Sequence, residues 1–189
     1  MIVKETVIEG VKILNPKVFP DSRGCFMESW NRKSFTEVGI KDDFVQDNIS
    51  VSRKGVLRGI HTQLRCPQSK LVSCINGSIY DVVVDCRKNS PSFGKWHGEI
   101  LSFENNSQLY IPAGVAHGFY AIEDATVMMK VTTHYLPGDE IGFIWNDKDV
   151  NIQWPFLGND DLIFAEKDLH WESFKNMIAR IDDFVHNKK

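Results

Sequence analysis

One short basic segment carries the residues best suited to acid–base chemistry. His61 lies within residues 51–70, a segment that contains no aspartate or glutamate. The five cations of this segment are Arg53, Lys54, Arg58, Arg65 and Lys70. The chain as a whole has a formal net charge of -3, so the segment opposes the global charge, and clustered cations attract an anionic ligand. A solvated basic loop would have the same composition, but a histidine can transfer protons near neutral pH. The pattern therefore favours an anion-binding site with proton-transfer chemistry.

A second histidine follows a turn of the form P-x-G-x-x-H, made by Pro112, Gly114 and His117. Together with the glycine-rich turn before His61, this is the two-motif layout of a cupin jelly roll. Metal-dependent cupins need at least three ligands. Here Gln63 stands where the first motif would have its second histidine, and no acidic residue lies between Gln63 and Asp81. The sequence therefore predicts acid–base chemistry without a metal.

Short β-strands must position these residues. Apolar and β-branched runs alternate with turn residues at short intervals, which is typical of an antiparallel sandwich or barrel. The predicted strands are two within 2–19 and one each at 25–30, 44–51, 71–75, 78–85, 98–103, 108–111, 118–122, 126–133 and 141–145. Asn76-Gly77 between two apolar runs predicts a β-hairpin. Residues 31–40 are polar and compatible with a short helix or a loop. The prediction is an all-β fold.

The end of the chain departs from this strand pattern. Apolar residues recur at spacings of three and four, which predicts an amphipathic helix over 169–186 that packs on the strands. With 189 residues, 42% of them hydrophobic and 25% charged, we expect one domain over 1–189. We find no apolar run of about twenty residues and no basic-then-apolar leader. These features predict a cytoplasmic protein that is neither inserted in a membrane nor secreted.

Composition also bears on nucleic-acid binding and on disulfides. The modest acidity argues against a nucleic-acid-binding protein, which would carry a basic domain. The cysteines show no C-x-x-C spacing, so reduced and mostly buried thiols are expected rather than disulfides. They are Cys25, Cys66, Cys74 and Cys86.

A series of motifs resembles the dTDP-4-dehydrorhamnose 3,5-epimerase family, the RmlC-like enzymes of nucleotide-sugar metabolism. The motifs are FPDSRG (19–24), FVQDN (44–48), VLRGIH (56–61), KLV (70–72), GSIYDVVVD (77–85), SPSFGKW (90–96), IPAGVAHGF (111–119), and WNDKD and IQWPF within 145–156. The resemblance extends to about residue 168. It implies a homodimeric jelly roll without metal or other cofactor that acts on a nucleoside-diphospho-4-keto-6-deoxy sugar.

The resemblance also implies roles for individual residues. The 4-keto group acidifies the C–H bonds at C3 and C5, and His61 matches the base that removes a proton. Asp168 matches the carboxylate that orients this imidazole, although a helix N-cap before Leu169 is an alternative. Lys70 matches the lysine that stabilises the enolate oxygen. Arg58 is placed to bind sugar or phosphate. Nucleotide contacts contributed at the dimer interface are matched by Arg23, Glu28, Gln46 and Asn48. His117 and Asp81 line the same pocket in the family. For His117 alone, a satisfied core histidine is the simpler interpretation.

Met129 is the most informative departure from the family pattern. The family has a tyrosine immediately before the lysine of the late strand, and this tyrosine is the acid on the face opposite the histidine. Alignment on Lys130 places Met129 there, and a methionine has no exchangeable proton. Tyr135 matches a different family position, one that packs against the base or sugar. Thr62 and Ser73 depart from a usual aromatic residue and a common arginine. We therefore predict an epimerase that inverts C3 alone or C3 preferentially.

Several alternatives remain at this point. The enzyme could invert both C3 and C5 with water or another side chain as acid, or it could be a 3,4-ketoisomerase of the same substrate class. A sugar-nucleotide-binding cupin without activity is the non-enzymatic alternative. The carrier (dTDP, GDP or CDP) and the ring (hexose or heptose) are not specified by the sequence. A pathway of bacterial surface polysaccharide synthesis, such as capsule, is the usual setting of the family.

Overall fold

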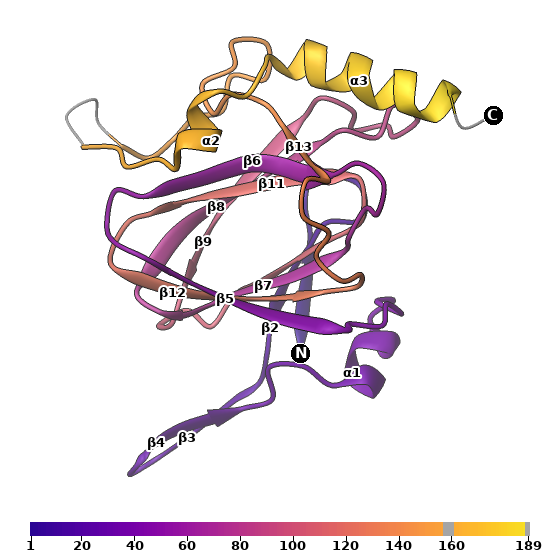
Figure 1. The fold of residues 1–189 in the computed structure, drawn as a ribbon. Helices are drawn as coiled ribbons and strands as arrows, with labels where there is room; N and C mark the ends of the chain where they lie inside the picture. The colour runs from indigo at the N-terminus through magenta and orange to yellow at the C-terminus, as the bar shows by residue number, and fades with distance from the viewer. Residues whose placement is uncertain (157–160, 188–189) are drawn as a thin grey trace.

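The computed structural model describes residues 1–156 and 161–187, and they form two packed antiparallel sheets with a helix across one of them (Figure 1). The six-stranded sheet has the order β1 (Ile2–Glu5), β2 (Lys12–Asn15), β10 (Gln108–Ile111), β7 (Lys70–Asn76), β12 (Ala125–Val131) and β5 (Gln46–Ser52). The five-stranded sheet has the order β13 (Glu140–Gly142), β6 (Leu57–Gln63), β11 (Val115–Ala121), β8 (Ser78–Asp85) and β9 (Trp96–Ser102). The predicted all-β jelly roll with a C-terminal helix is confirmed.

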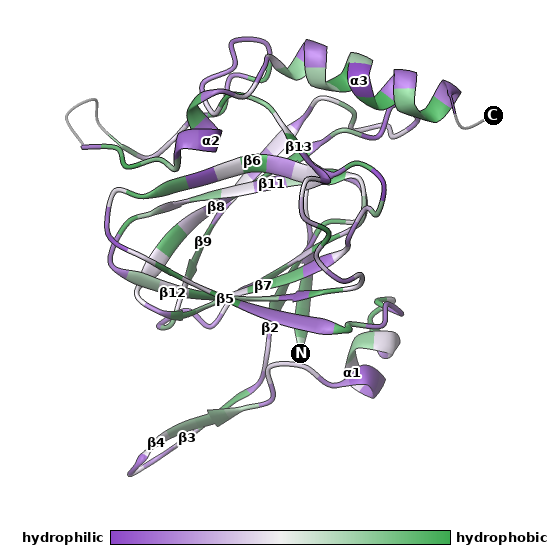
Figure 2. Ribbon diagram, viewed as in Figure 1, coloured by the Kyte–Doolittle hydropathy of each residue, from purple (hydrophilic) through white to green (hydrophobic). Residues whose placement is uncertain are grey.

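The core lies in two layers. Aliphatic side chains of both sheets fill the space between them, and the central strand β11 is buried along its whole length. The outer face of the five-stranded sheet is covered by α3 (Phe174–His186), which buries Phe174, Met177 and Ile178. Hydrophobic and hydrophilic residues alternate along this helix in Figure 2, as expected for an amphipathic helix with one packed face. The sheet that carries the two histidines is therefore held from both sides.

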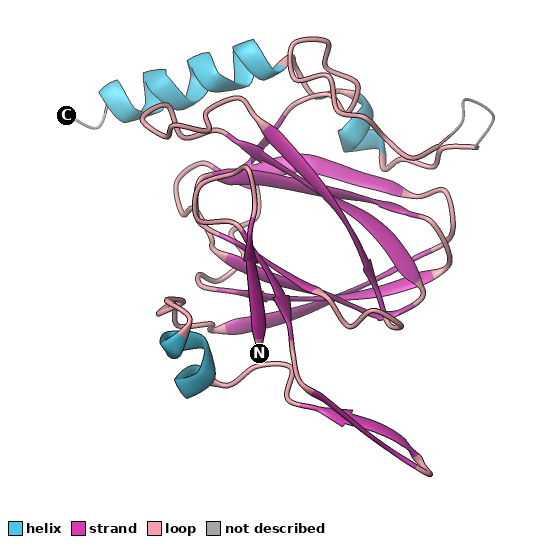
Figure 3. Ribbon diagram, turned by 180° about the vertical axis from the view of Figure 1, so that it is seen from behind, coloured by secondary structure: helices cyan, strands magenta, loops and turns pink. Residues whose placement is uncertain are grey.

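The C-terminal helix is shorter than predicted. A four-residue helix, α2 (Glu166–Leu169), ends before it, and α3 begins only at Phe174. Between them the chain is extended, and Glu172 forms a parallel bridge with Phe143. Ser173 ends this segment and caps α3 by accepting a hydrogen bond from the backbone N–H of Asn176. The apolar spacing of three and four residues includes Trp171. The bridge at Glu172 and the cap at Ser173 nevertheless make α3 begin only at Phe174. Figure 3 shows α2 and α3 as separate helices.

The Asn76-Gly77 hairpin prediction is wrong. β7 pairs with β10 and β12, whereas β8 pairs with β9 and β11, so the turn passes from one sheet to the other. Gly77 has a φ of 71°, and a Cβ there would lie 2.1 Å from the backbone oxygen of Asp124. The Asn-Gly pair was read correctly as a tight turn, but a turn signal does not specify which strands pair across it.

A hairpin near the N-terminus extends away from the sheets. It consists of β3 (Val18–Asp21) and β4 (Gly24–Met27), which pair only with each other among the described residues. Figures 1 and 3 show it projecting from the body of the molecule. The short helix α1 (Arg32–Glu37) follows, capped by Asn31, and buries Phe35 against the six-stranded sheet.

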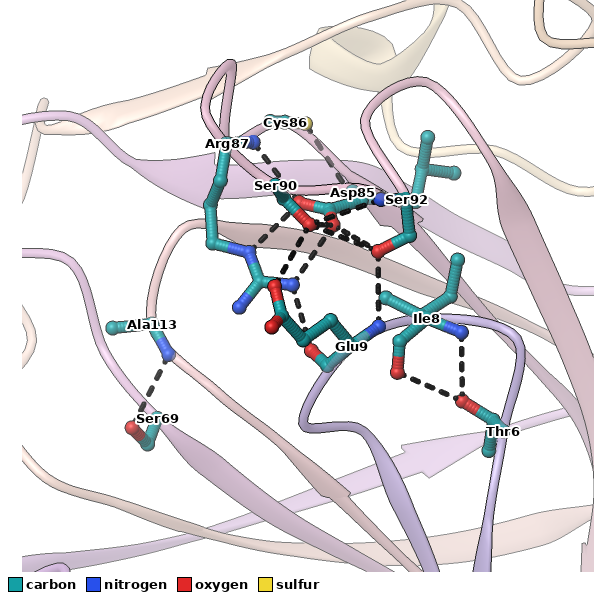
Figure 4. A network of polar contacts seen from close by, with 11 residues as sticks. Thr6, Ile8, Glu9, Ser69, Asp85, Cys86, Arg87, Ser90, Ser92 and Ala113 are labelled. Atoms are coloured by element: carbon teal, nitrogen blue, oxygen red, sulfur yellow. Dashed lines mark hydrogen bonds and ion pairs between the residues drawn. The ribbon is translucent and has the colours of Figure 1, made fainter.

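A buried carboxylate fastens the N-terminal segment to the connection after β8 (Figure 4). Asp85 accepts hydrogen bonds from Arg87, Ser90 and Ser92, and Arg87 also donates to the backbone oxygen of Glu9. Burial raises the pKa of Asp85, but these hydrogen bonds outweigh it and lower the pKa to about 2. The network is structural and lies apart from the cavity described below.

Two further expectations concern the whole chain. All four cysteines are free, with Cys74 and Cys86 buried and Cys25 and Cys66 exposed. Within residues 1–156 and 161–187, no helix is both long and apolar enough to cross a membrane.

Candidate active site

A cavity of about 520 Å³ opens between the two sheets and contains most of the predicted site residues. We call one side the histidine wall: His61, His117, Glu140, Lys167 and Asp168, from the five-stranded sheet and α2. We call the other side the lysine wall: Gln46, Asn48, Lys70, Met129 and Val131, from the six-stranded sheet. Arg58 and Tyr135 also line the cavity.

Strand pairing fixes the position of His61. His61 on β6 lies directly opposite His117 on β11, and its Nδ1 is 3.3 Å from the backbone oxygen of His117. Gly59 permits this close approach, since a Cβ at residue 59 would lie 2.6 Å from the same oxygen. Nδ1–H donating to the carbonyl leaves the lone pair of a neutral imidazole on Nε2. In the tautomer that donates from Nδ1 to this carbonyl, Nε2 is the basic nitrogen.

The surroundings of His61 favour its neutral form. Burial, followed by the positive charges of Lys70 and Lys167, holds the pKa of His61 well below its usual value. Its side chain is nevertheless 22% exposed toward the cavity. His61 is therefore an uncharged, accessible imidazole at neutral pH, which is the state required of a general base.

Glu140 is the carboxylate that contacts His61, and the sequence did not reveal it. Its Oε1 is 3.2 Å from Nε2 of His61, and its Oε2 accepts a hydrogen bond of 2.5 Å from Lys167. The short strand β13 pairs with β6 so that Glu140 lies opposite Gln63 and Gly142 opposite His61. Sequence alone gives no signal for this pairing, because residues 138–140 resemble an ordinary acidic turn. The negative charge of Glu140, 3.2 Å from Nε2, would stabilise an imidazolium formed there.

Asp168 lines the same cavity, but the structure, which describes both residues, does not show the predicted contact between Asp168 and His61. Its Oδ1 accepts a hydrogen bond from the indole N–H of Trp171 at 3.2 Å. Burial raises the pKa of Asp168, and the Trp171 and Gly59 N–H groups partly offset this rise. The N-cap alternative is wrong, because Asp168 lies inside α2 and Ser173 caps the next helix. Asp168 therefore holds the backbone of β6 two residues before His61.

His117 is a buried, hydrogen-bonded histidine. Its Nε2 is 2.9 Å from Oδ2 of Asp81, and the exposed fractions of the two residues are 2% and 0%. Its backbone oxygen positions His61, as described above. The core interpretation is therefore confirmed. His117 also lines the cavity, and its contact with a substrate stays a prediction.

Lys70 faces the cavity from β7. Burial lowers its pKa from 10.5 to about 8, against the opposing attraction of Asp81 and Glu140. These two carboxylates have other ion-pair partners, His117 and Lys167. The Lys70 ammonium thus adds positive charge to the cavity while its proton is held less firmly than in an exposed lysine.

The lysine wall otherwise offers neutral groups. Met129 lies on β12, and its apolar side chain packs against the core. Gln46 donates to Asn48 at 2.7 Å, and its amide oxygen accepts from the backbone N–H of Tyr135 at 3.1 Å. Arg58 donates to Ser52 and to a backbone oxygen, which uses two of its five N–H donors. Gln46 and Asn48 of this wall, and Arg58 on β6 of the other sheet, are polar groups available for a substrate.

Arg23 and Glu28 do not reach the cavity of their own chain. Arg23 is at the tip of the projecting hairpin, where it pairs with Asp21, and Glu28 accepts hydrogen bonds from Asn31 and Ser34. Neither lines the cavity. No group of three or more His, Cys, Asp or Glu side chains in the described parts of the chain is arranged to hold a metal ion.

Comparisons with known proteins agree with this geometry. The family model for dTDP-4-dehydrorhamnose 3,5-epimerase matches residues 5–176. The dTDP-4-dehydrorhamnose 3,5-epimerase of Shigella flexneri is 50% identical over 177 residues, which cover 92% of this chain and 96% of the relative.

Two solved structures are informative because they contain sugar nucleotides. RmlC of Legionella pneumophila, a dTDP-6-deoxy-D-glucose-3,5-epimerase in complex with dTDP-4-keto-L-rhamnose, has a TM-score of 0.90 at 43% identity and covers 95% of each chain. ChmJ of Streptomyces bikiniensis, a 3'-monoepimerase in complex with dTDP-quinovose, has a TM-score of 0.84 at 31% identity, covering 93% of this chain and 88% of ChmJ.

Proposed function

Because this chain belongs to the dTDP-4-dehydrorhamnose 3,5-epimerase family, isomerases that act on sugar nucleotides, we propose that it inverts C3 of a dTDP-4-keto-6-deoxy sugar. The observation that carries the proposal is the placement of His61 and Lys70 on opposite walls of one cavity, with Met129 beside Lys70. The cavity thus combines a candidate base, a cation that can stabilise an oxyanion, and a methionine at the position where the family has a tyrosine.

The first step is removal of the C3 proton by Nε2 of His61. The electrons of the C–H bond form the C3=C4 double bond, and negative charge develops on the C4 oxygen. Lys70 stabilises this charge, and such stabilisation is often the largest catalytic effect. Glu140 stabilises the imidazolium formed on His61. Asp168 is a positioning residue, since it holds β6 next to His61.

Met129 is the basis for proposing inversion at C3 alone. The family tyrosine at this position would give a proton to the carbon on the face opposite the base, and a thioether cannot do so. ChmJ, a similar protein of 31% identity, is a 3'-monoepimerase, so inversion of one centre occurs among similar proteins. A ChmJ variant replaces a tyrosine by phenylalanine together with a histidine, so ChmJ does not by itself link this specificity to the loss of a tyrosine. The alternative of inversion at both carbons is favoured by the names of the closely related proteins. These names give no support to a ketoisomerase or to a binding protein without activity.

The substrate contacts are proposed by residue. Arg58, with N–H donors to spare, is placed for a diphosphate or sugar oxygen at the cavity mouth. Gln46 and Asn48 present amides to the sugar nucleotide, and the ring of Tyr135 is half-exposed beside them. We favour a dTDP carrier over GDP because the two solved relatives hold dTDP-sugars.

We propose that the active form is a homodimer. The outer face of the edge strand β5 exposes Ile49 by 66% and Val51 by 72%, and the projecting hairpin exposes Phe26 by 71%. A second copy of the chain would bury this apolar surface. Arg23 and Glu28 would then reach the cavity of the partner.

The dimer has a direct test in analytical ultracentrifugation. We expect a dimer for the wild type, and a shift toward monomer for Phe26→Asp but not for Lys175→Glu, an exposed control on α3. Arg23→Ala should leave the dimer intact and raise KM. A monomeric wild type with full activity would contradict this part of the proposal.

The central experiment measures solvent exchange. The dTDP-4-keto-6-deoxy sugar is incubated in D2O, and deuterium and configuration at C3 and C5 are followed by NMR. We expect incorporation and inversion at C3, and a gain at C5 for Met129→Tyr. A GDP-linked 4-keto sugar in parallel should exchange more slowly. Efficient inversion of both carbons by the wild type would exclude the single-centre reaction, and no exchange at all would exclude the epimerase.

A further inference from the structure

Inversion at a carbon requires a proton donor on the face opposite the base. The base lies in the histidine wall, so the donor must come from the lysine wall. The lysine wall consists of Gln46, Asn48, Lys70, Met129 and Val131, and Ser50 on β5 also lines the cavity. Met129 and Val131 carry no exchangeable proton, and amides and hydroxyls are far weaker acids than an ammonium group. One acidic group remains in this set.

The register of the six-stranded sheet places Lys70 beside Met129. Lys70 lies opposite Val131, and Val72 lies opposite Met129. Side chains two residues apart share a face of the sheet, so Lys70 and Met129 are diagonal neighbours, with Cβ atoms somewhat less than about 7–8 Å apart. The four-methylene arm of a lysine spans this distance. The Lys70 ammonium can therefore occupy the space in front of Met129.

We propose that Lys70 is the acid that returns the proton to C3 on the face opposite His61, in addition to stabilising the C4 oxygen. This assignment rests on the proposed epimerase function. Lys70 would donate the proton that the family tyrosine donates in related enzymes. This chain has Met129 at the position of that tyrosine.

The atoms and electrons balance as follows. Nε2 of His61 takes the C3 proton, and an enolate forms between C3 and C4. The double-bond electrons then take a proton from the Lys70 ammonium, which forms the new C3–H bond and restores the C4 carbonyl. Lys70 is left as a neutral amine and His61 as an imidazolium. Solvent water in the open cavity returns the proton from His61 to Lys70 between turnovers.

The electrostatic surroundings suit a proton donor. Burial lowers the pKa of Lys70 to about 8, and a general acid is most effective with a pKa near the working pH. The ionisable groups that line the cavity around it are His61, His117, Glu140, Lys167, Asp168, Arg58 and Tyr135, with Asp81 behind His117. At pH 7 the ammonium is still mostly protonated, and it releases its proton more readily than an exposed lysine does.

Tyr135 is the competing donor in the cavity. It lies beyond the end of β12, its backbone N–H is bound by Gln46, and its side chain is 50% exposed. A half-exposed phenol beyond the end of the strand should reach a carbon bound between the walls less readily. Lys70, at the first residue of β7 and within the cavity, is better placed.

The test separates exchange from inversion. Lys70→Arg keeps a positive charge for the C4 oxygen, but an arginine does not release its proton in proteins. We expect the variant to incorporate deuterium at C3 with retention, because His61 can return a proton to its own face. Inversion should fall about 100-fold relative to exchange, in line with the usual effect of a general acid. Lys130→Arg is the matched control, since Lys130 pairs with Asp47 outside the cavity.

Two further measurements distinguish loss of the acid from a disturbance of substrate binding by the larger arginine side chain. Met129→Tyr in the Lys70→Arg background should recover inversion, because it supplies a new acid on the same wall. In the wild type, the ratio of inversion to exchange should fall as pH rises through about 8. Lys70→Arg with a wild-type ratio, or a wild-type ratio that stays flat to high pH, overturns the assignment. Failure of the wild type to exchange C3 would instead overturn the proposed function.

Discussion

The two walls of the cavity are built in opposite ways. The histidine wall is a connected set of charges, in which Lys167 binds Glu140, Glu140 contacts His61, and His61 rests on the backbone of His117. The lysine wall has one charged group facing the cavity, Lys70, among amides and apolar side chains.

This difference concerns the two halves of a proton transfer. Removal of the proton, in our proposal, is supported by several groups that contact His61 and stabilise its charged form. Return of the proton, in our proposal, depends on one side chain. Substitutions in the histidine wall should therefore lower exchange and inversion together, whereas substitutions in the lysine wall should separate them.

His61→Asn should have the largest effect. It removes the imidazole that contacts both the His117 carbonyl and Glu140, and a general base contributes about 10²–10⁴-fold to rate. We expect deuterium incorporation at C3 to fall by about three orders of magnitude, with inversion falling equally. NMR-monitored exchange measures both. The control is His170→Asn, which replaces an exposed histidine on the surface. Exchange that survives His61→Asn would show that His61 is not the base.

Glu140→Gln should have the next largest effect. The imidazolium would lose the negative charge 3.2 Å from its Nε2. An opposite charge within about 4–6 Å shifts a pKa by about 1–3 units, so we expect the rate to fall by about 10–100-fold. Exchange and inversion should again fall in parallel. Glu166→Gln, an exposed glutamate 85% accessible to solvent, is the matched control. A fall in inversion alone would place Glu140 on the acid side and break the comparison between the walls.

The pH dependence of kcat/KM tests the charge state of His61. Burial, Lys70 and Lys167 lower its pKa well below 6.5, and the base acts only when neutral. Activity should therefore persist below pH 6.5 and be lost as pH falls through the lowered pKa. Glu140→Gln removes a charge that favours the imidazolium, so it should move this acid limb to still lower pH. An acid limb at or above 6.5 would contradict the low pKa.

Much of the fold was predictable because it follows from local patterns. The strand at residues 108–111 has its predicted bounds, and the strand over 78–85 does too. Pairing was harder to predict. The Asn76-Gly77 turn has its signal in the sequence, but the choice of partner strand depends on how two sheets close on one another.

The site was predictable to the same degree. His61 and Lys70 lie in motifs that resemble the family, and both face the cavity. Glu140 could not be found, because its role depends on a three-residue strand, β13, that brings it beside β6. The expected partner of His61, Asp168, is engaged by Trp171 instead. Tertiary placement of a short strand thus decided which carboxylate contacts the base.

The smallest expected effects come from the two helix caps, one on the outer side of each sheet. Ser173 caps α3 and Asn31 caps α1 through side-chain oxygens. Replacing either residue with alanine should lower the free energy of unfolding by about 1 kcal/mol and Tm by about 2–4 °C, as measured by calorimetry. Ser173→Asp and Asn31→Asp preserve the cap and serve as controls. Because α3 packs beneath the strands of the histidine wall and α1 against the sheet of the lysine wall, the ratio of inversion to exchange is the sharper readout. It should be unchanged in all four variants, and a change confined to Asn31→Ala would mean that the acid side depends on the packing of α1 as well as on Lys70.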